Sequence, residues 1–129
     1  MICYFASDLP DTRGWLVWDK KNGEVSFADA ELAWTNLDQA VRVIAEHIGT
    51  IRNRSHPTQK PVSVIAWCIE KTEGLIFDPF LGSGTTLIAA EQLNRKCFGM
   101  EISPAYCDVI VKRWEQLTNK KATLEVNHG

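Results

Sequence analysis

The most restrictive feature of this chain is the order of segments within residues 61–117, which is typical of helix, strand, glycine loop, helix, strand and helix. Leu75-Ile76-Phe77 is short and wholly apolar, as expected of a buried parallel strand. The loop Asp78-Pro79-Phe80-Leu81-Gly82-Ser83-Gly84 follows it, a helix begins at Thr85, and residues 96–100 form a second strand. Two parallel strands joined through a helix make a right-handed βαβ unit. The sequence therefore predicts an α/β fold.

The helices of this region carry local start and stop signals. Pro61 suits the first helical position, and Gly74 suits the position just after a helix end. Ser103 and Pro104 supply an N-cap and a first helical residue for the last helix. Apolar side chains recur at helical spacing in all three helices: Val62, Ile65 and Ile69; Leu87, Ile88, Ala89, Ala90 and Leu93; and Tyr106, Val109, Ile110, Trp114 and Leu117.

The first half of the chain gives weaker signals. Residues 14–18 predict a strand, and Lys21-Asn22-Gly23 predicts a hairpin turn before another strand at 25–27. A further strand is expected at 31–35. Residues 38–48 fit a helix or an edge strand, and the pattern does not choose between them.

Composition describes one ordinary globular domain: the chain has 129 residues, of which 45% are hydrophobic and 23% charged. The net charge of −2 excludes a strongly basic protein that wraps nucleic acid. The charge is uneven, because residues 1–51 hold four basic and eight acidic residues, whereas residues 52–129 hold ten basic and eight acidic residues. No apolar run reaches the ~18 residues of a membrane span, and no leader opens the chain. We expect a cytoplasmic protein with no membrane partner.

The four cysteines, Cys3, Cys68, Cys97 and Cys107, form no C-x-x-C pair and no metal-ligand spacing with the histidines. Cys68 and Cys97 lie in apolar runs, where cysteine is usually a small core residue. Neither a metal site nor a disulfide is expected.

The glycine loop indicates a ligand site, because backbone N–H groups at a strand–loop–helix junction favour an anionic group. Gly82 and Gly84 give G-x-G, but Leu87 stands where the dinucleotide fingerprint has its third glycine, and no G-K-[ST] follows. A G-x-G alone also fits a turn that needs positive φ. The hypothesis that the chain is a nicotinamide-dependent oxidoreductase is therefore supported only by the predicted βαβ unit.

Two carboxylates flank this loop. Glu101 ends the second strand, 19 residues after Gly82, where an acid in nucleotide-binding units accepts hydrogen bonds from ribose hydroxyls. The alternative is a surface glutamate favoured by a helix dipole. Asp78 ends the first strand, and two carboxylates would repel a pyrophosphate. S-adenosyl-L-methionine fits, since it has positive sulfonium and amino groups and a ribose diol.

Three motifs lie in this half of the chain: HPTQKP at 56–61, DPFLGSGTT at 78–86 and GMEISPAYCD at 99–108. Together they closely resemble the DNA amino-methyltransferases, which methylate adenine N6 or cytosine N4. Their order resembles the class with cofactor motifs C-terminal to the catalytic one, and residues 13–36 are similar to a segment of phage and prophage members. The resemblance implies a Rossmann-like, S-adenosylmethionine-dependent methyltransferase sheet and a role in DNA methylation, as in restriction-modification.

The resemblance also implies roles for single residues. Glu101 would hold the ribose, Ile102 would pack against the adenine, and Lys60 would pair with the cofactor carboxylate, with a solvated loop lysine as its alternative. The other cofactor-binding residues would be His56, Thr58, Gln59, Asp78, Phe80, Gly82, Ser83, Gly84 and Thr85. Double-stranded DNA would be contacted through its phosphates by Arg42, Arg52 and Arg54, for which ordinary surface arginines are an equal alternative.

The family's catalytic D-P-P-[YFW] loop, which accepts hydrogen bonds from the amino group of an extruded base, has no counterpart here. No two of the five prolines are adjacent, and Asp78-Pro79-Phe80 already matches the cofactor loop. No catalytic residue is therefore predicted. We expect residues 1–129 to form one partial DNA methylase domain, with strands, a hairpin and a DNA-contacting segment at 13–54 and the cofactor-binding half at 55–117.

An incomplete sheet has consequences for stability and function. The family places another strand between Leu75–Phe77 and Leu16–Trp18, so without it the halves need a new pairing or expose unpaired edges. An isolated monomer is expected to be poorly stable or to self-associate. The expected function is methyl transfer to adenine or cytosine in DNA, with this chain supplying the cofactor-binding part. The alternative is a non-catalytic remnant, or a half that joins a polypeptide with the missing segment or a second copy of itself.

Overall fold

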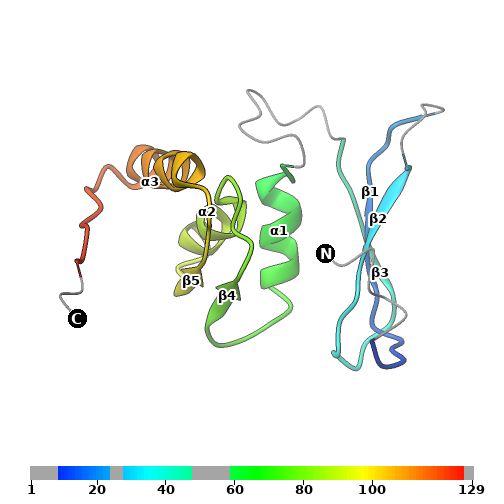
Figure 1. The fold of residues 1–129 in the computed structure, drawn as a ribbon. Helices are drawn as coiled ribbons and strands as arrows, with labels where there is room; N and C mark the ends of the chain where they lie inside the picture. The colour runs from blue at the N-terminus through cyan, green and yellow to red at the C-terminus, as the bar shows by residue number, and fades with distance from the viewer. Residues whose placement is uncertain (1–8, 24–27, 48–58, 127–129) are drawn as a thin grey trace. The chain divides into compact units, whose positions relative to one another are not determined.

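A computed structural model describes residues 9–23, 28–47 and 59–126 of the chain (Figure 1). The chain divides into two compact units, Met1–Asn53 and Arg54–Gly129. In its described part, the first unit holds three strands, and the second holds two strands and three helices.

The first unit is built on a three-stranded sheet. β1 (Leu16–Asp19) is the central strand, antiparallel to β2 (Ala30–Ala33) and parallel to β3 (Arg42–Ala45). The strands expected at 14–18 and 31–35 are confirmed. Of the two alternatives for residues 38–48, a helix or an edge strand, the structure shows the edge strand β3.

The turn after β1 keeps its two arms together. The Lys20 N–H donates to the Asp29 carbonyl at 2.8 Å, and the Asn22 side chain donates to the Ala28 carbonyl at 3.0 Å. Lys21 and Gly23 both have positive φ, 47° and 66°. The hairpin turn at 21–23 stays a prediction, because residues 24–27, with the strand predicted at 25–27, lie outside the described residues.

Every second side chain of β1 is buried, and these side chains form the core of this unit. Leu16 and Trp18 are buried on one face of the strand. The Trp18 indole N–H donates to the Glu46 carbonyl at 2.7 Å, so the buried ring has its polar atom satisfied. The Lys20 ammonium lies 3.0 Å from the Glu31 carboxylate, which compensates its burial.

The second unit contains the predicted βαβ sequence between two further helices. Its elements are α1 (Val62–Ile69), β4 (Ile76–Asp78), α2 (Thr85–Gln92), β5 (Cys97–Gly99) and α3 (Pro104–Thr118). β4 and β5 are parallel, with Ile76 opposite Cys97 and Phe77 opposite Phe98, as expected. α1 and α2 lie side by side, and their core is Ile69, Ala89 and Ala90, with Ile76 and Cys97 packed against it (Figure 1).

The sequence misplaces both ends of α1. Pro61, with φ −58° and ψ 139°, is the N-cap and not the first helical residue. α1 ends at Ile69, so Gly74 with φ 82° does not directly follow its end. Arg95 holds the segment between Ile69 and Gly74, since its guanidinium donates to the carbonyls of Thr72 at 2.8 Å and Gly74 at 2.7 Å. A side chain distant in sequence therefore fixes the segment after the helix.

The prediction of a buried strand at 75–77 is also wrong. Ile76 faces the helical core, whereas Leu75 and Phe77 are 67% and 62% exposed on the opposite face. Phe98 and Met100 are likewise exposed. We call Leu75, Phe77, Phe98 and Met100 the apolar sheet face. It is exposed because helices cover only one face of this two-stranded sheet, which is a small, partial form of the expected Rossmann-like sheet.

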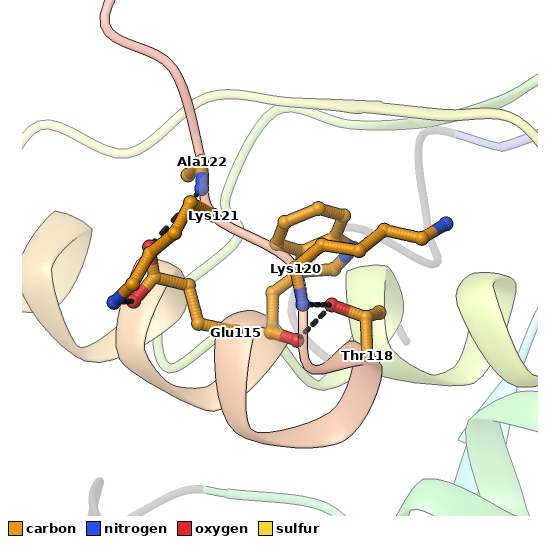
Figure 2. A network of polar contacts seen from close by, with 6 residues as sticks. Glu115, Thr118, Lys120, Lys121 and Ala122 are labelled. Atoms are coloured by element: carbon orange, nitrogen blue, oxygen red, sulfur yellow. Dashed lines mark hydrogen bonds and ion pairs between the residues drawn. The ribbon is translucent and has the colours of Figure 1, made fainter.

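A network of polar contacts closes the end of α3 (Figure 2). Ser103 and Pro104 are the N-cap and first residue of this helix, as predicted, and Asn119 ends it with φ 57°. The Glu115 carboxylate accepts from the Lys121 ammonium at 2.8 Å and from the Ala122 N–H at 3.0 Å. These hydrogen bonds, first that of Lys121, hold the pKa of the Glu115 carboxyl below its usual value. The chain after α3 therefore folds back over the last helical turns.

The cysteines of the described residues are free thiols. Cys97 packs against the core, Cys68 and Cys107 are half-buried, and Cys3 lies outside the described residues. Burial raises the pKa of the Cys68 thiol, and burial together with the Asp78 charge raises that of Cys97. Neither thiol has the lowered pKa of a nucleophilic cysteine.

Within the described ranges, no three His, Cys, Asp or Glu side chains are grouped so that they could hold a metal ion. No helix in that part of the chain is both long and apolar enough to cross a membrane.

Candidate functional site

The loop between β4 and α2 is anchored to the end of β5 by backbone hydrogen bonds. The Met100 N–H donates to the Asp78 carbonyl, and the Leu81 N–H donates to the Met100 carbonyl, both at 2.9 Å. The Gly84 N–H closes the loop on the Leu81 carbonyl at 2.9 Å. The glycine loop therefore lies at the carboxyl end of both strands, which is the edge where open α/β sheets bind ligands.

Asp78, the last residue of β4, orients the start of this loop. One carboxylate oxygen accepts from the Phe80 N–H at 2.9 Å, and the other accepts from the Thr86 hydroxyl at 2.6 Å. The carboxylate thus joins the end of the strand to the first turn of α2. Each oxygen keeps a second lone pair with which it can accept from a ligand.

Glu101, just after β5, holds the loop from the other side. Its Oε2 accepts from the Gly82 N–H and its Oε1 accepts from the Ser103 N–H, both at 2.8 Å. The two bonds fix the plane of a half-buried carboxylate next to the loop. Both oxygens again retain acceptor capacity. The structure therefore gives Glu101 a definite role in shaping the site, which sets it apart from a freely solvated surface glutamate.

The two glycines of the loop have the same backbone requirement but different surroundings. Gly82 and Gly84 have φ of 55° and 83°, where side chains are strained. A Cβ atom on Gly84 would lie 3.0 Å from Ile110, so glycine there lets α3 approach. A Cβ atom on Gly82 would meet only the Phe80 carbonyl oxygen, at 4.0 Å. The space beside the Gly82 backbone is therefore open to a ligand.

Ser83 and Thr85 are buried in the structure, at 4% and 8% exposure. The Ser83 side chain and backbone are held from α3. Arg113 of α3 donates from one guanidinium nitrogen to both the Ser83 carbonyl oxygen and the Ser83 hydroxyl. Burial lowers the pKa of the Arg113 guanidinium from its ordinary value. Arg113 was not among the residues predicted from the sequence, because it lies 30 residues from Ser83 and no local pattern joins the two.

Two large apolar side chains are almost fully exposed to solvent at the same edge of the sheet. Phe80 is 88% exposed, and its N–H donates to Asp78, whereas Ile102 is 98% exposed and lies between Glu101 and Ser103, which are joined by a hydrogen bond. An exposed aromatic and an exposed aliphatic group next to fixed carboxylates are typical of a ligand site that combines apolar contact with hydrogen bonds.

The remaining predicted residues are only partly described. Gln59 and Lys60 are half-buried just ahead of α1, and both take part in polar interactions. His56 and Thr58 lie outside the described residues, as do Arg52 and Arg54. Arg42 is exposed on β3, in the first unit.

The residues at this edge fit S-adenosyl-L-methionine. Glu101 and Asp78 offer acceptors for a ribose diol and an ammonium group, and Phe80 and Ile102 offer apolar contact for an adenine ring. Gly82 leaves the room that close approach to the backbone requires. Two carboxylates so near the loop disfavour a pyrophosphate, which carries the same sign of charge.

The family of the chain is shown by a match between its sequence and a family sequence model. The sequence model of the DNA methylases, which covers N6 and N4 methyltransferases, matches residues 13–112. This range covers most of the chain and includes the glycine loop, Glu101 and α3 as far as residue 112. The chain belongs to the DNA methylase family, and its resemblance to the DNA amino-methyltransferases is confirmed.

Curated relatives include type II DNA methyltransferases. M.ScaI of Streptomyces caespitosus is 35% identical over 100 residues, which are 74% of this chain and 33% of that protein. M.HindIII of Haemophilus influenzae is 38% identical over 76 residues, which are 57% of this chain and 23% of that protein. The chain thus spans a third or less of the length of these two relatives.

Solved structures show the same fold. The M1.HpyAVI complex with S-adenosylmethionine superposes with a TM-score of 0.63 at 24% identity, over 78% of this chain and 60% of that one. TTHA0409 of Thermus thermophilus, complexed with S-adenosyl-L-methionine, superposes with a TM-score of 0.56 at 17% identity, over 83% and 54%. The fold is therefore that of S-adenosylmethionine-dependent methyltransferases, as predicted.

Proposed function

We propose that this chain binds S-adenosyl-L-methionine and forms the cofactor-binding part of a methyltransferase that acts on an exocyclic amino group of adenine or cytosine in DNA. The observation that carries the proposal is the Glu101 carboxylate, held by the Gly82 and Ser103 N–H groups beside the exposed Phe80 and Ile102. The methyltransferase fold and the type II methyltransferase relatives support it.

Each residue at the site has a task in this proposal. When bound, the cofactor would supply an electrophilic methyl group to the target amino nitrogen, with its sulfonium carbon–sulfur bond broken to leave S-adenosylhomocysteine and the amino proton lost to solvent. Glu101 accepts from the ribose hydroxyls, and Asp78 opposes the positive charge at the methionine end. Phe80 and Ile102 contact the adenine, and Gly82 lets the ligand approach the backbone. The chain has no pair of adjacent prolines and so no D-P-P-aromatic loop, and we assign it no catalytic residue.

DNA is the proposed macromolecular partner. Arg42, which is exposed on β3, would meet phosphates together with Arg52 and Arg54. Phosphate contacts of this kind carry no sequence information, so the choice of adenine or cytosine and of its flanking sequence needs other residues. Since its relatives are bacterial, we place the chain in the cytoplasm of a bacterial or phage-infected cell.

Titration calorimetry with S-adenosylhomocysteine, the demethylated product, tests cofactor binding directly. We expect a one-to-one complex in the micromolar range that NAD does not displace. Gly82→Ala is expected to weaken it about tenfold or more, because the new methyl group occupies the open space beside the backbone.

Gly74→Ala is the matched control for that variant. Gly74 also has positive φ, 82°, and nothing lies within 4 Å of its Cβ position, so both alanines carry backbone strain without a clash. Both variants should lose about 1 kcal/mol of unfolding free energy, and only Gly82→Ala should lose affinity. Equal affinities in the two variants, or displacement by NAD, would contradict the proposed site.

A second candidate function is that of a half which complements another polypeptide. The apolar sheet face favours it, since Leu75, Phe77, Phe98 and Met100 are each at least half exposed. In the described part, β4 and β5 also pair only with each other, which leaves each with an unpaired edge. A polypeptide that brings a strand and apolar side chains would cover both features.

Complementation is tested by adding a polypeptide that carries a D-P-P-Y segment and measuring methyl transfer from labelled cofactor to DNA. We expect activity only in the mixture, and its loss when Phe77→Lys puts a charge on the apolar sheet face. Leu124→Lys is the matched control, since Leu124 is 87% exposed on the C-terminal segment. No transfer at any mixing ratio would exclude a complementing half.

A further inference from the structure

α3 supports the glycine loop at two neighbouring positions. Arg113 donates to the carbonyl oxygen and the hydroxyl of Ser83, and Ile110 packs against Gly84. Residues 110 and 113 are three apart and so lie on one side of the helix. Ile110 is buried and Arg113 is half-buried, so this side of α3 forms the floor beneath the loop.

The bond to the Ser83 carbonyl determines where the next N–H group points. In a trans peptide the C=O and the following N–H point in opposite directions. Arg113 holds the Ser83 carbonyl, and the Gly84 N–H accordingly points to the Leu81 carbonyl at 2.9 Å. No cis peptide occurs among the described residues. One guanidinium therefore fixes the orientation of a whole peptide unit in the loop.

Without Arg113 this peptide unit would keep the Gly84 N–H bond to Leu81 but no bond on its carbonyl from Arg113, and Ser83 stands between two flexible glycines. Glu101 holds the loop only through the Gly82 N–H, on the other side of Ser83. Glu101 thus holds the Leu81–Gly82 peptide by its N–H, and Arg113 holds the Ser83–Gly84 peptide by its carbonyl, one on each side of the Gly82–Ser83 peptide.

We propose that Arg113 is a positioning residue for the cofactor loop: by holding the Ser83 peptide from α3 it keeps the loop in the conformation that binds S-adenosylmethionine. The inference rests on the proposed cofactor site and extends it to a residue outside all three sequence motifs. Arg113 touches the loop and not the ligand, so its loss is expected to act through loop order.

The experiment compares Arg113→Met with Arg95→Met. Arg95 also donates to backbone carbonyls, those of Thr72 and Gly74, but those residues follow α1 and lie outside the glycine loop. Both variants remove a guanidinium that holds carbonyls, so a general loss of stability is matched. Hydrogen exchange of the loop amides at 82–85 and calorimetric affinity for S-adenosylhomocysteine are measured for each.

We expect Arg113→Met to speed loop exchange about tenfold and to weaken binding about tenfold, since a charge-assisted hydrogen bond is lost. Arg95→Met should leave both within about twofold. Arg113→Lys, which keeps one charged donor, should recover part of both effects. Equal loop exchange and equal affinity in Arg113→Met and Arg95→Met would overturn the inference.

The two readouts separate this inference from the proposed function. If the wild-type chain does not bind S-adenosylhomocysteine, the proposed function fails, and loop exchange alone decides the positioning role. If Arg113→Met does not fold, Arg113→Lys and Arg95→Lys take the places of the two methionine variants, because each keeps the charge and loses the guanidinium that bonds to the carbonyls. Faster loop exchange in Arg113→Lys than in Arg95→Lys then supports the inference, and equal exchange overturns it.

Discussion

Replacing Glu101 with alanine is expected to weaken the binding of S-adenosylhomocysteine about a hundredfold. The substitution removes the acceptors proposed for the ribose diol, and it also frees the Gly82 and Ser103 N–H groups that the carboxylate holds at 2.8 Å. The two hydrogen bonds proposed from the ribose hydroxyls to this charged acceptor would contribute about 3 kcal/mol to binding. Their loss corresponds to an affinity about a hundredfold weaker. Titration calorimetry measures the affinity, and urea denaturation measures the accompanying loss of stability.

Glu101→Gln gives a graded comparison for this prediction. Its amide keeps one acceptor oxygen but turns an NH₂ group toward one of the two backbone donors, so we expect an affinity between those of the wild type and Glu101→Ala. Glu115→Ala is the control, because Glu115 also accepts from a backbone N–H but lies at the end of α3 (Figure 2). A Glu101→Ala chain that folds and binds as tightly as Glu115→Ala would disprove the role of Glu101.

The parts of the fold that the sequence predicts well are those fixed by neighbouring residues. The βαβ order follows from an apolar run, a glycine loop and a cap at Ser103, all of them local signals. Exposure was not predictable in this way. Phe77 lies in an apolar run typical of a strand buried on both faces, yet it is 62% exposed because helices cover only one face of the sheet.

The candidate site shows the same division between local and distant signals. Asp78 and Glu101 are found from the sequence because each ends a strand, and parallel strands bring their carboxyl ends together. Arg95 and Arg113 are missed because each contacts carbonyls more than 20 residues away, across packed helices. These two side chains hold the segment after α1 and the glycine loop, so neither contact could be derived from local pattern.

Gly84→Ala is expected to be the most destabilising single substitution in the loop. Alanine at φ 83° is strained by about 1 kcal/mol, and its Cβ would lie 3.0 Å from Cγ1 and 3.2 Å from Cγ2 of Ile110. Ile110 is β-branched and buried, so it has little freedom to move aside. Overpacking of this kind adds about 1–3 kcal/mol, for a total loss of about 2–4 kcal/mol in unfolding free energy.

Gly74→Ala separates strain from overpacking, because Gly74 has φ 82° with nothing within 4 Å of its Cβ position. The difference in urea midpoint between the two variants therefore measures the contact with Ile110. Ile110→Ala leaves a cavity that can receive the new methyl group, so the double variant Gly84→Ala/Ile110→Ala should be more stable than the sum of the single losses predicts. Losses that add without coupling, or equal midpoints for Gly74→Ala and Gly84→Ala, would show that α3 does not pack on the loop as the structure has it. The floor proposed for the cofactor site would then be lost as well, since Arg113 reaches Ser83 from the same side of that helix.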